Sequence, residues 1–291
     1  MHRFVLHNRE LREAGETVLA PGQVGFLNGW GVFSTLRVSA GTLFAFERHY
    51  ARMERDARRL RVPFPFSPDE LETALRKLVE ANQAWDAVLR VAVVRNRGGL
   101  FEGPGIERES DLVAFTAALA DWGEGVHLSY VPNARFGASP FAGAKITSWA
   151  ENLTWYEQAH ENGFDEVILL NENGEVSECT SANIFAIQGQ RVSTPPLATS
   201  GCLPGVTRAI LLEEIRVPGI EIREQTITPS ELEAADRVFI TSTTRDLLPV
   251  LSIDGYDLKQ EMKVFALLRE AFASYRETYG RKAGSHHLVH S

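Results

Sequence analysis

The sequence predicts an α/β protein with two domains. The chain has 291 residues, which is long for one hydrophobic core and comfortable for two. Short apolar runs typical of strands alternate with capped, amphipathic segments typical of helices. A polar segment with two glycines, residues 121–125, interrupts this pattern as a linker does. We therefore expect a smaller N-terminal α/β domain at 1–120 and a larger C-terminal α/β domain at 126–291.

The first half of the chain alternates between strand and helix patterns. Residues 38–46 contain a turn at Ala40-Gly41 between two strand-like runs, which predicts a hairpin. Residues 47–60 predict a charged helix. The next helix begins at Ser67-Pro68-Asp69-Glu70, where serine is the N-cap and glutamate completes a capping box. Strands rich in valine, leucine and phenylalanine are expected at 89–94 and 112–116.

The second half continues the alternation. Residues 151–162 predict a helix that ends at Gly163. Asn173-Gly174 is the strongest short hairpin signal in the chain. Residues 228–231, Thr-Pro-Ser-Glu, form a second capping box. The remaining expected elements are strands at 126–131, 165–170, 176–177 and 238–241, and helices at 206–215 and 261–275.

Composition limits the classes of function. Hydrophobic content of 44% and charged content of 23% are ordinary for a globular protein, and the net charge of −8 argues against nucleic acid or an anionic membrane as partner. Two cysteines, Cys179 and Cys202, favour a reducing compartment. Neither a signal peptide nor a transmembrane run is predicted, so we expect a cytoplasmic protein. The histidines at 286, 287 and 290 are interpreted as a solvated tail, and no metal site is expected.

Lys145 lies in a short stretch of small and apolar residues, 142–147. Such surroundings disfavour the ammonium form, so the side chain can act as a neutral amine that attacks a carbonyl. A lysine whose head reaches water explains the local sequence equally well. Glu178 is the kind of acid that keeps a pyridine nitrogen protonated, although an exposed strand acid fits its local sequence better. Together the two residues suggest an enzyme that uses pyridoxal phosphate (PLP).

Three segments carry donors suited to an anion. At 201–208 a glycine-rich turn enters a helix, whose first amides and dipole attract negative charge. A threonine and serine cluster, 241–244, follows a predicted strand. Arg52 shares a helix face with His49. Each segment has a simpler explanation, namely a structural turn for the first two and a solvated basic face for Arg52, which spacing alone favours.

Taken in chain order, these segments resemble the class IV aminotransferases (PLP fold type IV), which include branched-chain aminotransferases, D-amino acid aminotransferases and aminodeoxychorismate lyase. The resemblance extends from residue 22 to 254 and is most specific at 163–185 and 194–208. It implies a two-domain α/β fold with the cofactor at the domain interface, and a homodimer.

The resemblance also implies a role for each residue of the site. Lys145 would form the internal aldimine with PLP and later carry the proton, and Glu178 would pair with the pyridine nitrogen. Leu203 would pack against the pyridine face. The phosphate ligands would be Arg52, Val206, Thr207, Ser242 and Thr243.

Departures from the family pattern bear on the substrate. Branched-chain enzymes usually have Val-Phe-Glu where this chain has residues 32–34, Val-Phe-Ser, and a tyrosine at the position of Ala150. The Arg-x-His carboxylate trap of D-amino acid enzymes is replaced by Leu100 and Glu102, and the asparagine of the lyase by Ser148. Candidate substrate-binding residues are Phe33, Arg37, Arg95 and Thr244, with structural ion pairs as the other explanation of the arginines.

Three hypotheses follow. The first is a PLP-dependent aminotransferase that acts on an amino acid, most like the branched-chain type, and a 2-oxo acid. The second is aminodeoxychorismate lyase, which releases pyruvate from 4-amino-4-deoxychorismate. The third is a non-catalytic relative that only binds PLP or a partner, and the intact set of Arg52, Lys145 and Glu178 argues against it.

Overall fold

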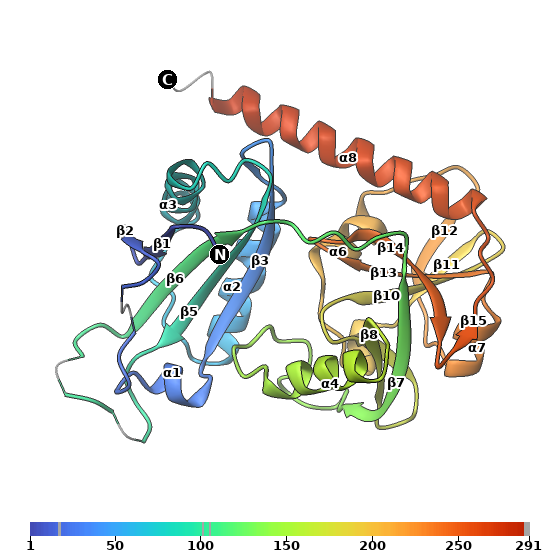
Figure 1. The fold of residues 1–291 in the computed structure, drawn as a ribbon, viewed down its shortest axis with the longest axis horizontal. Coiled ribbons are helices and arrows are strands. Elements are labelled where there is room, and N and C mark those ends of the chain that lie inside the picture. The colour runs from blue at the N-terminus through green and yellow to red at the C-terminus, as the bar shows by residue number, and fades with distance from the viewer. Residues whose placement is uncertain (17–18, 101, 105, 288–291) are drawn as a thin grey trace. The chain divides into compact units, whose positions relative to one another are not determined.

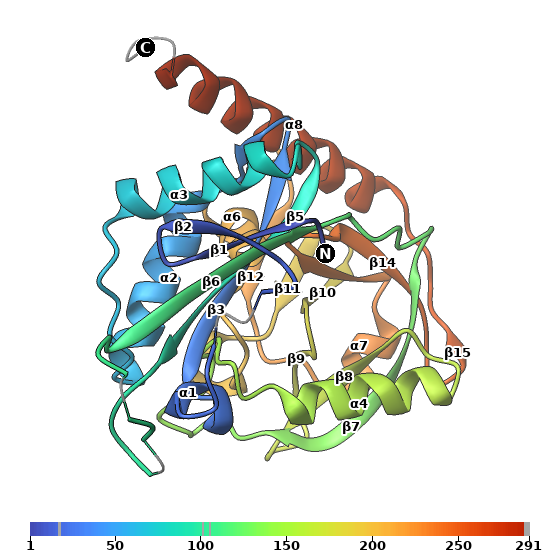
Figure 2. The ribbon, with the colours of Figure 1, turned by 60° about the vertical axis from the view of Figure 1, so that its left-hand side comes forward.

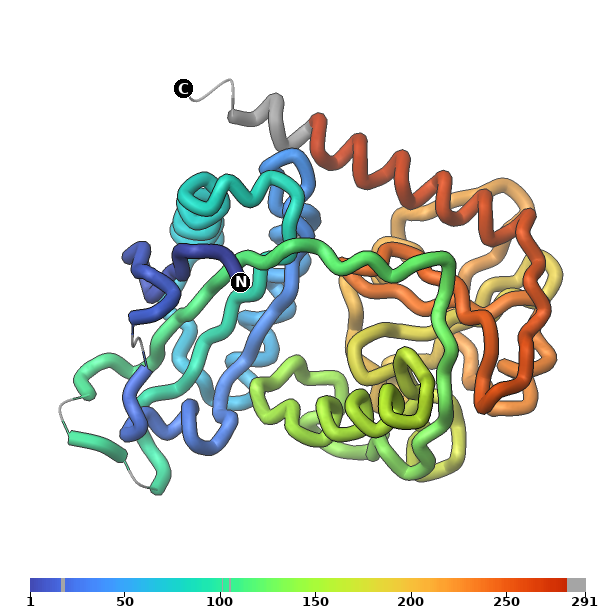
Figure 3. Tube along the Cα trace, in the orientation of Figure 1, coloured from blue at the N-terminus to red at the C-terminus, as the bar shows by residue number. Residues whose placement is uncertain are grey.

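The computed structural model describes residues 1–16, 19–100, 102–104 and 106–287. The chain forms two compact units (Figures 1 and 3). The first unit contains residues 1–120, 144–149 and 278–291, and the second contains residues 121–143 and 150–277. Lys145 belongs by its contacts to the first unit. Among the described residues, no helix combines the length and the hydropathy needed to cross a lipid bilayer.

The first unit is built on a six-stranded antiparallel sheet in the order β2-β1-β6-β5-β3-β4. Its strands are β1 (Phe4–His7), β2 (Glu10–Glu13), β3 (Gly31–Ser39), β4 (Thr42–Leu43), β5 (Ala87–Arg95) and β6 (Ser110–Ala117). Its helices are α1 (Val24–Asn28), α2 (Phe46–Arg59) and α3 (Pro68–Ala81). Helices α2 and α3 cover one face of this sheet (Figures 1 and 2).

Strand alternation divides the first sheet into two faces. Leu36 of β3 and Leu89 of β5 point to the helices and pack with Met53 of α2 and Leu75 of α3 in one buried core. Successive side chains of a strand point to opposite faces, so Arg90 of β5 points away from this core. The face opposite the helices is therefore available to hold functional groups.

The second unit is built on a nine-stranded mixed sheet in the order β12-β11-β10-β13-β14-β7-β8-β9, with β15 beside β14. Its strands are β7 (Val126–Arg135), β8 (Glu166–Asn171), β9 (Val176–Cys179), β10 (Asn183–Gln188), β11 (Arg191–Thr194), β12 (Glu221–Glu224), β13 (Arg237–Ser242), β14 (Asp246–Ile253) and β15 (Tyr256–Asp257). Its helices are α4 (Ala150–Glu161), α5 (Leu197–Ser200), α6 (Val206–Glu213) and α7 (Pro229–Ala234), and α8 (Lys263–His287) closes the chain. Phe239 stacks on Phe185 at 5.1 Å and contacts Phe265 of α8 at 5.3 Å, measured between ring centroids.

Local signals predicted several element ends correctly. Both capping boxes are formed, at Ser67 and at Thr228. Asn173-Gly174 connects the antiparallel pair β8 and β9, and Gly174 has the positive φ of 75° that such a turn requires. Gly163 follows α4 with a φ of 82°.

Other element limits were wrong. The second strand of the first hairpin has only two residues, because the chain turns at Ala45 into α2. The predicted strand 126–131 extends to Arg135, where it pairs with Asn171 of β8. The helix expected at 206–215 ends at Glu213, and the one expected at 261–275 runs from Lys263 to His287.

Candidate functional site

The backbone of Lys145 is held on both sides. Its N–H donates to Asp56 Oδ2 of α2 at 3.0 Å, and its carbonyl accepts from the N–H of Phe33 in β3 at 3.1 Å. The next residue, Ile146, forms an isolated antiparallel bridge with Val32. Lys145 Nζ lies 4.4 Å from the centroid of the Phe33 ring. A helix and a strand therefore together fix the backbone from which the Lys145 side chain extends.

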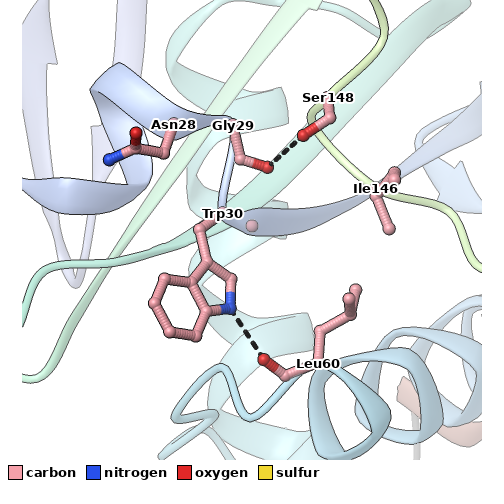
Figure 4. A pocket seen from close by; sticks show the side chains of 7 residues that line it. Asn28, Gly29, Trp30, Leu60, Ile146 and Ser148 are labelled. Atoms are coloured by element: carbon pink, nitrogen blue, oxygen red, sulfur yellow. Dashed lines mark hydrogen bonds between the residues drawn. The ribbon is translucent and has the colours of Figure 1, made fainter. Parts of the chain in front are cut away.

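A pocket of about 190 Å³ lies beside this segment (Figure 4). Trp30 Nε1 donates to Leu60 O at 2.7 Å, and Ser148 Oγ donates to Gly29 O at 2.9 Å. The Ser148 hydroxyl is thus bonded to the backbone of the pocket wall. The full lining consists of Asn28, Gly29, Trp30, Gly31, Leu60, Ile146 and Ser148.

Helix α2 carries a buried polar face toward β3. Arg52 Nη2 donates to Ser34 Oγ at 2.9 Å, and Ser34 Oγ lies 2.8 Å from His49 Nδ1. Arg52 Nη2 also lies 3.5 Å from His49 Nδ1. A guanidinium can only donate, so this contact favours Nδ1 as the acceptor and Nε2 as the protonated nitrogen of His49. Nε2 is buried and has no hydrogen-bond partner in the described part of the chain.

This arrangement corrects the interpretation of the α2 surface. Residue exposure is 1% for His49 and 7% for Arg52, so this face is not a solvated basic one. Burial, followed by the charges of Arg52 and Lys145, holds the pKa of His49 well below its usual value. Burial also lowers the pKa of Arg52 to about 10, against the opposing effect of Asp56. The imidazole is therefore neutral beside a charged guanidinium.

Glu178 is a buried acid on β9, which pairs with β8 and has all four residues buried. The interpretation as an exposed strand acid is therefore wrong. Its Oε1 accepts from Arg135 Nε at 3.1 Å, and its Oε2 accepts from the Leu203 N–H at 3.0 Å. The carboxylate is consequently held at both oxygens by groups of the second unit.

The start of α6 is built to approach its neighbours closely. Asn183 Nδ2 donates to Leu203 O at 2.8 Å, and a Cβ on the N-cap Gly205 would stand only 2.0 Å from Asn183 Oδ1. A side chain at residue 205 would therefore require Asn183 to move. Thr207 Oγ1 is buried with no hydrogen-bond partner among the residues described. The first amides of a helix have no intrahelical acceptor, so this helix start offers several donors to an anion.

The second donor cluster lies at the turn between β13 and β14. Ser242 Oγ accepts from the Arg245 N–H at 3.2 Å and stands 3.3 Å from Thr244 Oγ1. Thr241 Oγ1 is buried and, within the described ranges, has no partner. Thr241 pairs in register with Asn183, the residue that holds the α6 turn. The pairing therefore places the two donor clusters at the same end of the neighbouring strands β10 and β13. Thr243 lies in the turn that follows β13.

One functional candidate escaped the sequence-based reasoning. Arg90 lies with its guanidinium carbon 4.0 Å from the centroid of the Phe33 ring and 5.6 Å from that of Trp149. The Phe33 and Trp149 rings meet edge to face at 6.0 Å. Burial lowers the pKa of Arg90. The signal that could have found it is an arginine between the apolar residues Leu89 and Val91 of one strand.

The other substrate candidates have diverse environments. Arg37 is half-buried on β3. Arg95 donates to the carbonyls of Arg61 at 2.7 Å and Arg97 at 2.6 Å, contacts that hold neighbouring loops. Leu100 is 75% exposed, and Glu102 pairs with Arg97 at 3.1 Å. The side chains of the C-terminal histidines lie outside the described residues.

Comparisons with known proteins agree on one family. The family model for amino-transferase class IV matches residues 31–253. D-alanine aminotransferase of Bacillus licheniformis is 31% identical over 255 residues, 86% of this chain and 88% of that protein. A putative branched-chain-amino-acid aminotransferase of Methanocaldococcus jannaschii is 30% identical over 263 residues, 89% and 91% of the two chains.

Two further comparisons concern an aminodeoxychorismate lyase and a solved structure. Aminodeoxychorismate lyase of Vibrio harveyi is 28% identical over 260 residues, 87% of this chain and 94% of that protein. The solved structure of branched-chain amino acid aminotransferase from Escherichia coli superposes with a TM-score of 0.85 at 25% identity, covering 95% of each chain.

Proposed function

The chain belongs to the class IV aminotransferases, a family of PLP-dependent enzymes with the two-domain α/β fold, and from this premise we propose its reaction and substrates. The proposed reaction is transfer of an amino group between an amino acid of the branched-chain type and a 2-oxo acid. The observation that carries the proposal is the backbone clamp on Lys145, which presents the only lysine amine beside Phe33 in the described contacts.

The polar groups of the second unit fit PLP. The hydroxyls of Thr207 and Thr241 are buried without partners among the described residues, which suits a phosphate that accepts several hydrogen bonds. A buried carboxylate such as Glu178 suits a pyridine nitrogen. We assign the phosphate to Arg52, Val206, Thr207, Ser242 and Thr243, and the ring face to Leu203.

Each residue then has a defined task. When bound, PLP supplies the electron sink for chemistry at the substrate Cα. Lys145 Nζ takes the proton from Cα and returns it, as general base and acid. Glu178 would hold the ring-nitrogen end of PLP, with its carboxylate as the hydrogen-bond acceptor. Ser34 and His49 orient the Arg52 guanidinium through the hydrogen bonds at 2.9 and 2.8 Å.

The environment of Phe33 supports the choice of substrates. The Phe33 and Trp149 rings form an apolar wall beside Lys145 Nζ, which suits a branched aliphatic side chain. Arg90 lies on the same rings and supplies a cation for the carboxylate of an acidic 2-oxo acid. Leu100 and Glu102, at the positions of the D-amino acid carboxylate trap, argue against a D-amino acid substrate.

Aminodeoxychorismate lyase activity is the second candidate. The similarity to the Vibrio harveyi lyase, which extends over 94% of that protein, and the replacement of the branched-chain tyrosine by Ala150 favour it. Against it stands Ser148, whose hydroxyl donates to Gly29 O instead of offering the amide of the lyase. We also propose that the protein is a homodimer and lies in the cytoplasm. The mass of the purified protein by light scattering tests whether it is a dimer.

A donor screen decides between the two activities. The purified protein, saturated with PLP, is mixed with L-leucine, L-glutamate or D-alanine and a 2-oxo acid, and in parallel with 4-amino-4-deoxychorismate. We expect amino transfer from L-leucine to 2-oxoglutarate and no transfer by Lys145→Ala. Pyruvate release from 4-amino-4-deoxychorismate without transfer from any amino acid would replace the first proposal by the second.

A further inference from the structure

We propose that Arg135 is a positioning residue for Glu178, holding the carboxylate aimed at the ring-nitrogen end of the cofactor site. The inference rests on the proposed use of Glu178 toward PLP, and it assigns a task to a residue that the sequence motifs left out. It concerns groups of the second unit alone, so every contact on which it depends lies within one compact body.

The guanidinium of Arg135 is used on three sides. Nε donates to Glu178 Oε1, Nη1 to Ala134 O and Nη2 to Asn152 Oδ1, each at 3.1 Å. The side chains are nearly enclosed, with exposures of 18% for Arg135 and 10% for Glu178. A partly buried pair with additional hydrogen bonds to the cation is held far more firmly than a surface ion pair.

Asn152 connects this cation to the strand that carries the acid. Its Nδ2 donates to Thr180 O at 2.8 Å, two residues after Glu178. Asn152 lies in the first turn of α4 and is 9% exposed. The amide therefore bridges the arginine at the end of β7 and the chain that follows β9, so that the orientation of Arg135 follows that of the Glu178 backbone.

Thr180 is itself anchored. Its hydroxyl donates to Glu166 Oε1 at 2.5 Å and its N–H to the same oxygen at 3.3 Å. Glu166, on β8, is 1% exposed. The hydrogen bonds that hold the chain after Glu178 thus extend through Thr180 to a buried residue of the second sheet. They leave the Glu178 carboxylate little freedom to turn.

The geometric consequence is direct. Arg135 Nε and the Leu203 N–H each hold one oxygen of Glu178, so the carboxylate is fixed in one orientation. When PLP is bound, its ring nitrogen would have this carboxylate as hydrogen-bond acceptor. Loss of the Arg135 guanidinium frees one oxygen, so the carboxylate can turn and the ring nitrogen would lose that acceptor.

The test compares four variants loaded with ¹⁵N-labelled PLP. Arg135→Met removes the cation, Arg135→Lys keeps the charge without the bonds to Asn152, and Asn152→Ala removes the bridge alone. Arg276→Met is the matched control, because Arg276 also pairs with a carboxylate of the second unit, Asp246, and makes no contact with Glu178 within the described ranges. The readouts are the ¹⁵N resonance of the ring, the dissociation constant of PLP and the thermal unfolding curve.

We expect the ¹⁵N resonance of Arg135→Met to move toward that of neutral pyridine, and PLP to bind about tenfold more weakly, the loss of one charge-assisted hydrogen bond. Arg135→Lys should recover most of the ¹⁵N position, Asn152→Ala should shift it slightly in the same direction, and Arg276→Met should match the parent. An unchanged resonance in Arg135→Met overturns the proposal. If Arg135→Met does not fold, the proposal is overturned by a parent-like resonance in Asn152→Ala together with a fully shifted resonance in Arg135→Lys. Failure of the parent protein to bind PLP contradicts the proposed function instead.

Discussion

At the scale of single residues, the site depends on buried polar groups whose partners are few and specific. Asp56 is the clearest case, because one oxygen accepts the Lys145 N–H at 3.0 Å and the other pairs with Arg55 at 2.6 Å. Asp56 itself is only 1% exposed. Removal of this carboxylate leaves the Lys145 N–H without its acceptor.

Asp56→Ala should therefore destabilise the protein by about 1–3 kcal/mol, the penalty of an unsatisfied buried group. Asp56→Asn keeps an oxygen acceptor for the Lys145 N–H and should lose clearly less. Urea unfolding of the three proteins gives the comparison. Equal losses for Asn and Ala would mean that the charge, and not the hydrogen bond to Lys145, is what matters.

His49 makes stability depend on pH. Its pKa is held well below the usual 6.5 by burial first and then by Arg52 and Lys145. Below pH 6.5 the imidazole of residue 49 therefore binds a proton in the unfolded chain but not in the folded chain. The free energy of unfolding consequently falls as the pH falls. We expect His49→Gln to flatten this dependence between pH 6.5 and 5. Parallel curves for the variant and the parent in urea unfolding would refute the assignment.

Residue chemistry alone predicted only part of the site. Lys145 and Glu178 were proposed because a lone lysine and an acid stand at matching positions in an ordered set of segments, and their roles stay a prediction. The burial of Arg52 was not predictable, because helical spacing groups His49 with Arg52 without telling which face meets the sheet. Arg90 was missed because a single arginine in a strand gains meaning only when the opposite sheet face, with Phe33, is known.

At the scale of elements, the start of α6 is closely packed against Asn183. Asn183 Oδ1 lies where a Cβ of residue 205 would stand, at 2.0 Å. Gly205→Ala should therefore displace the helix start, lower the melting temperature and weaken PLP binding by about tenfold or more, since the first amides and Thr207 shift together. Gly15→Ala is the control, because a Cβ there meets nothing within 4 Å. PLP titration by fluorescence measures the effect, and binding equal to that of the control would exclude α6 as a phosphate site.

Element ends with their own chemistry were the predictable ones. The capping boxes at Ser67 and Thr228 and the Asn173-Gly174 turn act through neighbours in sequence, so they are visible without the fold. The extension of β7 to Arg135 depends on pairing with Asn171 of β8, and such long-range pairing leaves no local signal. The proposed positioning residue of the site stands at that unpredicted end.

At the scale of the whole molecule, the family membership and the two-domain α/β fold expected from the sequence are confirmed. The domain limits, 1–120 and 126–291, stay a prediction. Residues 121, 123 and 124 of the expected linker are exposed, so brief proteolysis should cut first within 121–125. Mass spectrometry of the fragments is the check, and a first cut inside an element of either sheet would contradict the limits.

The central claim is a covalent bond between PLP and the ε-nitrogen of Lys145. Borohydride reduction of the PLP-loaded protein, followed by digestion and peptide mapping, tests it most directly. The account predicts a phosphopyridoxyl group on the peptide that contains Lys145 and none on the peptides of Lys77 or Lys259. A label on another lysine, or no label at all, would contradict the account.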